Sequence, residues 1–444
     1  MNTDNPRFVA YQVLQSYYPG ETNLSQLLNK VLSGLGDFKD KGFVREIAWG
    51  VARYLNTLDY HINSFLEKKS LKTPIRNILR IGAFQLLYFT NRVPEYAAIN
   101  ETVELAKISG QSEFAPLCNA VLRKIQGAKT NLKLPEKDKN STLFYAVKYS
   151  HPEWLVQRWI KRFGEEEAEK LLLVNNRAPG LTIRANTLKV AREELRQKLE
   201  QEGFPCHVTE YSPQGILLYE NPELEALESF RAGLFVVQDE ASQLVSYLLA
   251  PKEGASVLDL CSGSGVKAMH IYELSKGKAK IKSVDNSSKQ LETAQKNFQR
   301  AGITGIELIN EDVLKLRNVE ADYILLDAPC SGLGAIRRKP DIKWNRSEKM
   351  LKKFSVLQKA MLHAASGYLK TGGTLVYSTC TVEPEENEEV IFDFLKKHKN
   401  FEVQQPRKET IPAGLLDETG YFLKTYPHRH IMDGFFAAIL KRMA

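Results

Sequence analysis

Between residues 257 and 377, five short apolar runs alternate with longer segments of helical periodicity, and this alternation restricts the fold more than any other feature. Each run is flanked by polar or turn-forming residues, as is typical of a strand buried on both faces. The runs are 257–260, 281–284, 306–309, 323–326 and 374–377. Strands that alternate with helices predict a doubly wound, mostly parallel sheet. The C-terminal half is therefore expected to be an α/β domain.

The end of the chain departs from this alternation. Two further apolar runs, 421–424 and 435–440, are separated by only a short loop. Spacing this short permits an antiparallel pair, whereas a parallel pair needs a long crossover connection. We therefore expect an antiparallel pair at the edge of the sheet.

The N-terminal residues 1–130 have helical periodicity throughout, and we expect an all-α domain there. Two of its helices are predicted to start near Pro74 and Pro94, because proline is favoured at the start of a helix. Arginines recur along the predicted helices, at Arg45, Arg53, Arg76, Arg80 and Arg123. They either form a solvated face of a helical bundle or contact RNA, and the pattern does not separate these alternatives.

A polar, lysine-rich stretch without periodicity, 127–142, is expected to be a linker. A small α+β module is predicted over 141–232, and the largest domain over 233–444. The elements expected in the module are strands at 181–183 and 215–219 and a helix at 191–199. Arg184 and Asn186 could face a nucleotide, but a structural polar pair at the strand edge is the preferred interpretation.

Composition excludes several classes of protein. A chain of 444 residues is expected to form more than one core, and a net charge of +8 favours an anionic partner such as nucleic acid. The sequence has no 18-residue apolar run and no signal-peptide pattern, so we expect a cytoplasmic protein without membrane contact. Five cysteines without a C-x-x-C pair indicate reduced thiols, with neither a disulfide frame nor a metal site.

The first predicted strand leads into V-L-D-L-C-S-G-S-G-V-K, residues 257–267. A strand that runs through Gly263 and Gly265 into a helix lets backbone N–H groups approach an anionic part of a ligand. An aspartate follows each of the next three strands, at Asp285, Asp312 and Asp327. Each signal alone is weak, because such an aspartate is often a helix cap, but together they indicate a nucleoside cofactor.

The kind of cofactor follows from what the loop lacks. The third glycine of the dinucleotide fingerprint is absent, since position 268 is alanine. Together with the antiparallel pair at the end of the chain, this favours S-adenosylmethionine over NAD.

Cys330 and Cys380 each lie just beyond a predicted strand, the fourth and the fifth, which are commonly neighbours in such a sheet. A single cysteine there would be interpreted as a small buried residue, but two beside a cofactor indicate catalysis. A thiolate is a good nucleophile. Attack on carbon 6 of a cytosine makes carbon 5 reactive enough to accept a methyl group. The second thiol can then assist release of the product.

Two charged segments follow these cysteines. Residues 337–344, R-R-K-P-D-I-K-W, are interpreted as a phosphate-binding patch. Residues 383–389, E-P-E-E-N-E-E, are interpreted as a helix start, with Pro384 in the first turn and carboxylates at the positive end of the helix dipole. A metal site is much less favoured there, since the sequence has no His or Cys set at metal-ligand spacing.

These motifs resemble the RsmB/Fmu/Sun family of bacterial 16S ribosomal RNA (cytosine-5)-methyltransferases. The resemblance rests on D-A-P-C-S-G, R-R-K-P-D-I-K-W and S-T-C-T-V-E-P-E-E-N-E, and it extends along the chain through S-H-P-E-W-L and L-T-I-R-A-N-T-L-K. It implies a NusB-like helical domain over 1–130, a small RNA-binding module over 141–232, and a Rossmann-like class I methyltransferase domain over 233–444. The implied partner is 16S ribosomal RNA, and a monomer is expected.

The resemblance also implies roles for individual residues. Cys380 would be the nucleophile, Cys330 would assist product release, and Asp327 would contact the target base and the methionine end of S-adenosylmethionine. Asp285 would hold the ribose, and Asp312 would lie near the adenine. The implied cofactor loop consists of Cys261, Ser262, Gly263, Ser264, Gly265, Val266 and Lys267.

The loop departs from the family pattern C-A-A-P-G-G-K, because Ser264 replaces the proline and Val266 replaces the second glycine. Valine is expected to narrow the backbone choices there. Two alternatives stay open: the same chemistry on another RNA such as transfer RNA, or, motivated by this departure, a ribosomal RNA-binding assembly factor without catalysis. A DNA methyltransferase is less favoured, because those enzymes need no Thr-Cys partner.

Overall fold

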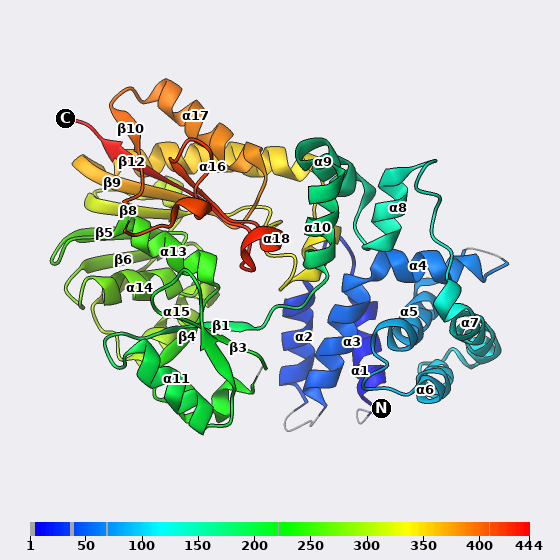
Figure 1. The fold of residues 1–444 in the computed structure, drawn as a ribbon. Helices are drawn as coiled ribbons and strands as arrows, with labels where there is room; N and C mark the ends of the chain where they lie inside the picture. The colour runs from blue at the N-terminus through cyan, green and yellow to red at the C-terminus, as the bar shows by residue number, and fades with distance from the viewer. Residues whose placement is uncertain (1–4, 36–39, 68–69, 221, 408) are drawn as a thin grey trace. The chain divides into compact units, whose positions relative to one another are not determined.

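A computed structural model describes residues 5–35, 40–67, 70–220, 222–407 and 409–444 (Figure 1). Its contacts divide the chain into two units, Met1–Arg177 with Ile336–Ser347, and Ala178–Ala335 with Glu348–Ala444. We name them the helical unit and the sheet unit. The predicted domain boundaries, at 1–130, 141–232 and 233–444, remain predictions.

The first part of the chain is helical, as predicted (Figure 1). Its elements are α1 Pro6–Gln15, α2 Leu24–Ser33, α3 Lys41–Arg53, α4 Leu55–Ser64, α5 Thr73–Tyr88, α6 Glu95–Ile108, η1 Ser112–Phe114, α7 Ala115–Ala128, η2 Lys129–Asn131, α8 Ser141–Lys148, α9 Glu153–Phe163 and α10 Glu165–Asn175. α5 has Pro74 in its first turn and α6 follows Pro94 directly, so both predicted helix starts are confirmed.

The core of these helices depends on a close approach between α3 and α5. The ring of Phe84 packs where a side chain on Gly50 would lie, since a Cβ atom there would be 2.0 Å from the ring. Apolar residues at helical spacing, such as Ile47, Val51 and Ile78, are fully buried around this contact. The helical periodicity of the sequence therefore corresponds to a single apolar core.

The arginines of these helices mostly have partners within the protein. Arg53 is buried and donates hydrogen bonds to the carbonyl groups of Asn175 and Arg337. Arg80 pairs with Asp59 at 2.6 Å, and Arg76 lies 3.6 Å from the same carboxylate. For these arginines the structural interpretation explains the position without RNA.

The sheet unit begins with a small antiparallel sheet of order β2-β3-β1-β4. Its elements are β1 Leu181–Ala185, α11 Arg192–Gln201, β2 Cys206–Val208, β3 Gly215–Leu218, η3 Leu224–Ala226, α12 Glu228–Arg231 and β4 Phe235–Val237. The predicted strands and helix of this region are present. The segment around Phe235, which was expected to open the large domain, pairs with β1 instead, because its ring is buried in the core of the small sheet.

The large sheet has the order β10-β12-β9-β8-β5-β6-β7, and β11 pairs with β12. Its strands are β5 Ser256–Leu260, β6 Lys280–Asp285, β7 Ile306–Asn310, β8 Ala321–Asp327, β9 Leu369–Thr379, β10 Phe401–Gln404, β11 Phe422–Lys424 and β12 Phe436–Arg442. The five predicted strands, β5 to β9, pair in parallel, and the predicted antiparallel pair is β11 with β12.

The position of the antiparallel pair differs from the prediction. β12 lies between β9 and β10 and pairs antiparallel with both, so it is an inner strand. The sequence analysis missed β10, which has only four residues and follows a lysine-rich helix end. Its sequence, F-E-V-Q, has only two apolar residues, which are too few to indicate a strand.

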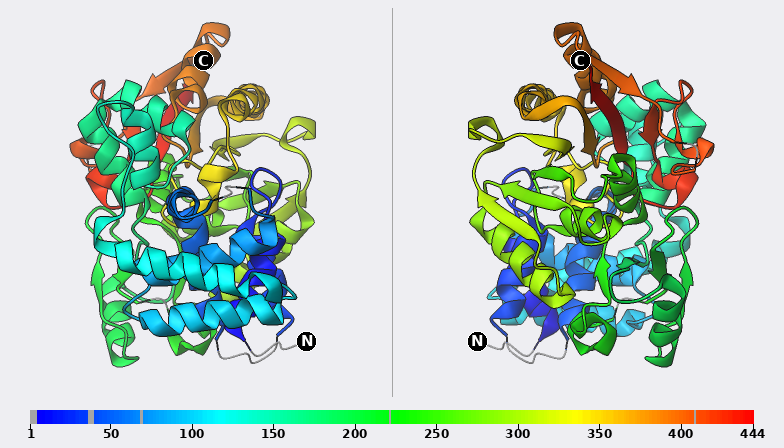
Figure 2. Two further views of the ribbon diagram at one scale, coloured as in Figure 1. Left: turned by 90° about the vertical axis from the view of Figure 1, so that its right-hand side faces the viewer. Right: turned by 90° about the vertical axis from the view of Figure 1, so that its left-hand side faces the viewer.

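Helices cover both faces of the large sheet, as the turned views of Figure 2 show. On one face, Val257 and Ile281 pack in a common core with side chains of α13 Glu240–Leu249, α14 Val266–Leu274 and α15 Ser288–Ala301. On the other face, Leu258 and Ile324 pack with side chains of α16 Glu348–Gly367 and α17 Glu388–Lys397. Since successive residues of a strand point to opposite faces, these strands need apolar residues on both faces.

Candidate active site

The predicted site residues lie at the carboxyl ends of the parallel strands. β5 and β6 are aligned so that Leu260 pairs with Val284, and Cys261 and Asp285 follow these two residues. β8 and β9 are aligned so that Asp327 pairs with Ser378, two residues before Cys380. The register therefore brings the predicted cofactor loop and the predicted thiols to one edge of the sheet.

The loop Cys261–Lys267 turns sharply between β5 and α14. Cys261, Gly263 and Gly265 have φ angles of 62°, 57° and 77°, in the left-handed region that glycine tolerates best. Gly265 also needs to lack a side chain, because a Cβ atom there would lie 2.5 Å from the ring of Phe298. The loop therefore lets the backbone approach a ligand closely at the start of a helix.

Val266 is the first residue of α14, and Gly265 before it adopts the left-handed conformation. Valine is compatible with helical backbone angles, at a small cost in side-chain entropy. The expected restriction at this position therefore has no consequence for the loop conformation. The neighbouring replacement, Ser264, contributes its carbonyl oxygen, which accepts a hydrogen bond from Asn297 at 3.0 Å.

Asp285 holds the cofactor loop against β6. One of its carboxylate oxygens accepts a hydrogen bond from the N–H of Gly263 at 2.8 Å, and the other accepts one from Ser287 at 2.9 Å. Each oxygen retains a second lone pair for another donor. Asp312, after β7, caps η4 Val313–Lys315 by accepting a hydrogen bond from Leu314 at 2.9 Å. The helix-cap alternative for an aspartate at a strand end is thus realised at Asp312.

Asp327, the last residue of β8, is held from two sides. One carboxylate oxygen is 2.6 Å from the ammonium group of Lys267, and the other accepts a hydrogen bond from the hydroxyl of Ser378 at 2.8 Å. Burial alone would lower the pKa of Lys267, but the Asp327 carboxylate outweighs it and the pKa is raised. Lys267 therefore keeps its charge, and it links the cofactor loop to the strand that precedes Cys330.

The sulfur atoms of Cys330 and Cys380 are 3.2 Å apart. This separation exceeds the roughly 2.05 Å of a disulfide bond, so the two groups are reduced and in contact. The hydrogen bond to Cys380, burial, and the carboxylates of Glu386 and Asp327 all raise the pKa of Cys330 well above its ordinary value. Cys330 therefore retains its proton and is suited to donate a hydrogen bond to the sulfur of Cys380.

The acidic segment 383–389 is only partly what the sequence suggested. Pro384 begins η6 Pro384–Glu386, and Glu388 and Glu389 occupy the first turn of α17, as expected for a helix start. Two acids of the segment, Glu383 and Glu386, are instead fully buried. Glu386 is buried because the loop after Cys330 supplies donors to it: the N–H of Ser331 at 2.8 Å and its hydroxyl at 2.5 Å.

We expected the basic segment after Cys330 to bind phosphate, and this expectation is wrong for Lys343. Within the helical unit, Lys343 is fully buried and donates hydrogen bonds to the carbonyl of Arg53 at 2.8 Å and to Asn176 at 3.1 Å. The indole N–H of Trp344 donates to the carbonyl of Ala52 at 2.6 Å. Burial and the neighbouring Arg53 lower the pKa of Lys343. Phosphate cannot reach a side chain enclosed in this way.

One buried carboxyl group beneath the loop was missed by the sequence analysis. Asp259 lies within β5, is 1% exposed, and neither of its oxygens has a hydrogen-bond partner within the described part of the chain. Burial raises its pKa to about 7, although the charge of Lys267 opposes the shift. The only signal in the sequence was an aspartate inside an apolar run, a position that burial makes unfavourable for a charge.

Arg184 and Asn186 do not face a nucleotide. Both side chains are fully buried, and Arg184 forms an ion pair with Glu273 and a hydrogen bond to Gln238. Asn186 donates to the carbonyl groups of Gly233 and Ala301. The preferred interpretation of a structural polar pair is confirmed, and the pair connects the small sheet to the helices of the large sheet.

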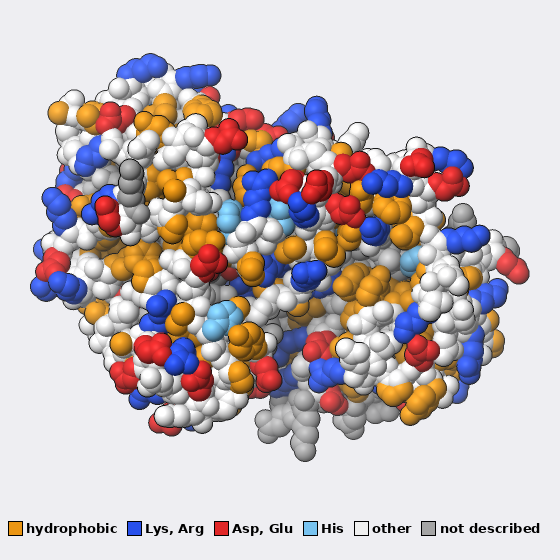
Figure 3. Space-filling model, viewed as in Figure 1, with side chains coloured by type: hydrophobic (Ala, Val, Ile, Leu, Met, Phe, Trp, Pro, Cys, Tyr) orange, Lys and Arg blue, Asp and Glu red, His pale blue; other side chains and the backbone are white. Residues whose placement is uncertain are grey.

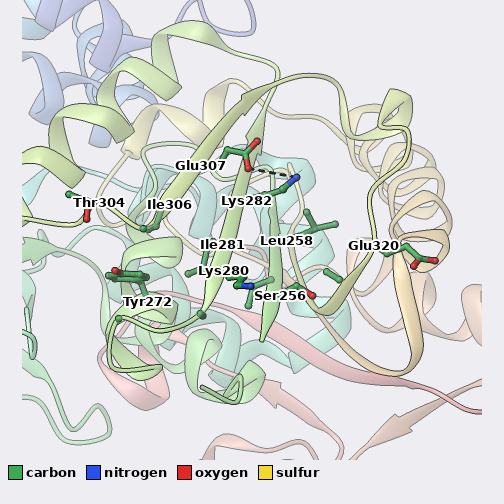
Figure 4. Close-up of a pocket in the computed structure, with 15 residues that line it drawn as sticks. Ser256, Leu258, Tyr272, Lys280, Ile281, Lys282, Thr304, Ile306, Glu307 and Glu320 are labelled. Atoms are coloured by element: carbon green, nitrogen blue, oxygen red, sulfur yellow. Dashed lines mark ion pairs between the residues drawn. The ribbon is translucent and has the colours of Figure 1, made fainter. Parts of the chain in front are cut away.

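A hollow lies at the amino-terminal ends of the parallel strands. This hollow of about 600 Å³ is lined by the first residues of β5, β6, β7 and β8, including Ser256 and Lys280. Figure 4 shows Lys282 and Glu307 along its wall, forming an ion pair of 3.7 Å. Because the predicted catalytic and cofactor residues follow the other ends of these strands, the hollow is not part of the candidate site.

No helix within the described ranges is long and apolar enough to cross a membrane. Among the same residues, no group of three or more His, Cys, Asp or Glu side chains could hold a metal ion. On the face shown in Figure 3, lysine and arginine side chains are interspersed with aspartate and glutamate.

A parallel sheet with a glycine-containing loop after β5, aspartates as the last residues of β6 and β8, and an inserted antiparallel strand β12 defines a Rossmann-like class I methyltransferase. Comparison with protein families narrows this class. Residues 246–441 match the family model of 16S rRNA methyltransferases RsmB/F, and residues 4–127 match the NusB family. Residues 151–225 match the ferredoxin-like domain of RsmF/B-like methyltransferases.

The similarity to known proteins extends over the whole chain. It is 32% identical to the probable ribosomal RNA small subunit methyltransferase B of Bacillus subtilis (strain 168), with 100% of each chain covered. It is also 32% identical to ribosomal RNA small subunit methyltransferase B of Escherichia coli (strain K12), over 94% of this chain and 97% of the relative. The chain therefore belongs to the RsmB family of ribosomal RNA small subunit methyltransferases, which depend on S-adenosylmethionine.

Solved structures agree with this assignment. The crystal structure of PH0851 is 26% identical, has a TM-score of 0.82 and is covered to 99%, as is this chain. The structure of NSun6 from Pyrococcus horikoshii with SFG, an analogue of S-adenosylmethionine, is 26% identical and has a TM-score of 0.61. The match covers 66% of this chain and 98% of the NSun6 chain.

Proposed function

We propose that the protein methylates carbon 5 of a cytosine in 16S ribosomal RNA of the small subunit. The contact between the sulfur atoms of Cys330 and Cys380, 3.2 Å apart at the strand ends that carry Asp327, is the observation that carries this proposal. The names of the bacterial relatives, which are small-subunit ribosomal RNA methyltransferases, support the RNA substrate. In this proposal the NusB-like residues 1–130 and the module 141–232 hold the RNA.

The cofactor loop fits S-adenosylmethionine, which supplies the methyl group. The left-handed turn at Gly263 and Gly265 keeps side chains out of the way of a bound ligand. The loop consists of Cys261, Ser262, Gly263, Ser264, Gly265, Val266 and Lys267. Asp285 has lone pairs available for ribose hydroxyls, and Asp312 would lie near the adenine. The carboxylate of Asp327, oriented by Lys267 and Ser378, would contact the methionine end and the target base.

Cys380 is the proposed nucleophile. Its thiolate attacks carbon 6 of the cytosine, and the electron pair of the ring double bond moves to carbon 5. Carbon 5 then takes up the methyl group, whose bond to the cofactor sulfur breaks, so that S-adenosylhomocysteine would be the leaving group. A base then removes the proton from carbon 5. That electron pair restores the ring double bond, and the bond between carbon 6 and the sulfur of Cys380 breaks.

Cys330 is proposed to assist this last step. Its raised pKa means that it carries a proton, and its sulfur lies within hydrogen-bonding distance of the sulfur of Cys380. A thiol that donates a hydrogen bond to the departing thiolate stabilises the negative charge formed on it. The target base must leave its stack to reach these sulfur atoms, since stacking hides carbon 5 and carbon 6.

The reaction and the substrate can be tested together. Unmethylated 16S RNA and transfer RNA are incubated separately with the full-length protein and S-adenosylmethionine, and nucleosides are analysed by mass spectrometry. We expect 5-methylcytidine in the 16S RNA only, no product with Cys380→Ser, and an unchanged yield with Cys206→Ser, which removes a thiol from the small sheet. Product in transfer RNA alone would establish the alternative substrate, and another methylated position would refute the chemistry.

The alternative of an assembly factor without catalysis is motivated by the altered cofactor loop. Isothermal titration with S-adenosylmethionine tests it, because a catalytic protein must bind the cofactor and the binding should be lost in Asp285→Ala. Glu311→Ala, an exposed acid on the adjacent segment, serves as the matched control. Failure to detect binding, both with and without RNA, would favour the assembly factor.

A further inference from the structure

Two adjacent residues, Glu386 and Asn387, contact the loops of the two cysteines. Glu386 accepts hydrogen bonds from the N–H and the hydroxyl of Ser331, the residue after Cys330, at 2.8 and 2.5 Å. Asn387 accepts a hydrogen bond from the hydroxyl of Thr379 at 2.6 Å and donates one to the carbonyl of Thr381 at 3.1 Å. Since Thr379 and Thr381 flank Cys380, Asn387 holds the Cys380 loop, whereas Glu386 holds the Cys330 loop and also interacts with the hydroxyl of Thr381.

A third side chain, that of Gln358, also forms hydrogen bonds at the Cys330 loop. The amide group of Gln358, from α16, donates to the carboxylate of Glu386 at 3.0 Å and to the carbonyl of Pro329 at 2.9 Å. Pro329 and Ser331 flank Cys330, so this loop is also held on both sides. The hydroxyls of Ser331 and Thr381 are 2.9 Å apart, which joins the two loops directly.

Burial makes these contacts strong and specific. Glu386 and Gln358 are fully buried, and Asn387 is 3% exposed. The N–H of Ser331 and the NH2 group of Gln358 donate to Glu386, and an ionised carboxylate suits both contacts, although burial raises the pKa of Glu386. Hydrogen bonds of this charge-assisted kind are shorter and stronger than neutral ones, and losing one leaves a buried group unsatisfied.

We propose that Glu386 and Asn387 are positioning residues for the two-thiol reaction, Glu386 acting through the Cys330 loop and Asn387 through the Cys380 loop. The inference rests on the proposed function, and it adds that the two steps of the reaction depend on different neighbours in one short segment. Asn387 serves the attack of Cys380 on carbon 6. Glu386 serves the elimination, in which the proton leaves carbon 5, the ring double bond re-forms and the sulfur of Cys380 departs with its electron pair.

The experiment follows the covalent RNA–protein adduct on denaturing gels, with full-length protein, 16S RNA and S-adenosylmethionine. The adduct should persist in Glu386→Gln, as in Cys330→Ala, because the thiol that assists release is displaced. In the Cys330→Ala background, Asn387→Ala should slow adduct formation by about a hundredfold, the effect of misplacing a reacting group by ~1 Å. Glu389→Gln, an exposed acid of the same segment, should change neither step.

Milder variants keep the test decisive if a substitution impairs folding. Ser331→Ala removes the hydroxyl contacts of the Cys330 loop to Glu386 and to Thr381, and Thr379→Val removes one hydrogen bond from the Cys380 loop. They should shift release and attack respectively, while cofactor affinity measured by titration stays at the wild-type value. A general structural role would instead reduce cofactor affinity and both steps together, and that result would overturn the proposal.

The variant Cys330→Ala distinguishes a failure of the proposed chemistry from a failure of the positioning roles. Absence of an adduct in Cys330→Ala itself would refute the proposed chemistry. A persistent adduct in Cys330→Ala, but complete release in Glu386→Gln and in Ser331→Ala, would refute only the positioning role of Glu386. Unchanged adduct formation in Asn387→Ala and in Thr379→Val would refute only that of Asn387.

Discussion

A basic segment follows Cys330 and an acidic segment follows Cys380, and each buries charge in a different way. In the basic segment, one backbone carbonyl and one side-chain amide oxygen of the helical unit accept hydrogen bonds from the ammonium group of Lys343. In the acidic segment, donors from the cysteine loop and from α16 surround the carboxylate of Glu386. Both arrangements show that a charged run that follows a candidate catalytic cysteine in the sequence can be structural, because a buried charge is tolerated where the chain supplies complementary groups.

The comparison also separates two kinds of influence on the thiols. The acidic segment belongs to the sheet unit and contacts the residues beside both cysteines directly. The basic segment belongs by its contacts to the helical unit, although it is inserted between β8 and α16 of the sheet unit. The acidic segment can therefore orient the thiols. The basic segment instead fixes residues 336–347 within the helical unit.

The largest effect is expected from removing the buried lysine. Lys343→Ala leaves the oxygens of Arg53 and Asn176 without their donor and opens a cavity, which should cost about 2–4 kcal/mol of stability. Lys339→Ala, on the exposed side of the same segment, should cost less than about 0.5 kcal/mol. Guanidinium unfolding of the two full-length variants measures the difference in stability. Equal unfolding midpoints would show that the side chain of Lys343 is exposed to solvent.

A smaller effect is expected in the dependence of stability on pH. Burial lowers the pKa of Lys343 in the folded protein. Between that lowered pKa and the ordinary lysine value, the unfolded chain binds more protons than the folded one, so stability rises with pH. Above the ordinary value the contribution is constant. Lys343→Met should lack this rise, and parallel stability curves for the variant and the wild type would contradict the buried charge.

The smallest expected effect concerns RNA. Because Lys343 is enclosed by protein, Lys343→Met should leave the salt dependence of 16S RNA binding unchanged, measured by filter binding at several salt concentrations. A phosphate contact would instead reduce the slope of the logarithmic plot by about one unit. A reduction of that size would restore the interpretation of this segment as a phosphate-binding patch.

Sequence patterns predicted the parts of the molecule that depend on periodicity and strand order. The five parallel strands follow from apolar runs buried on both faces, and the meeting of Asp285, Asp327 and the two cysteines at one edge follows from the rule that sites lie at strand ends. The helical starts at Pro74 and Pro94 follow from local backbone preferences. These features are encoded within a few residues of the chain.

Features that depend on distant partners could not be predicted in this way. The sequence shows that Glu386 and Lys343 are charged, but not that Ser331 or Arg53 would face them from far along the chain. Asp259 is similar, since its unpaired burial depends on the packing of the loop above it. The short strand β10 and the pairing of β4 with the small sheet also arise from tertiary contacts.

The most direct test of the central claim is the covalent adduct formed by the two cysteine variants. 16S RNA and S-adenosylmethionine are incubated with Cys330→Ala, Cys380→Ala and the double variant, and the products are separated on a denaturing gel. The two-thiol mechanism predicts a persistent adduct with Cys330→Ala and none with either variant that lacks Cys380. An adduct with Cys380→Ala, or equal loss of activity without any adduct in both single variants, would contradict the assignment.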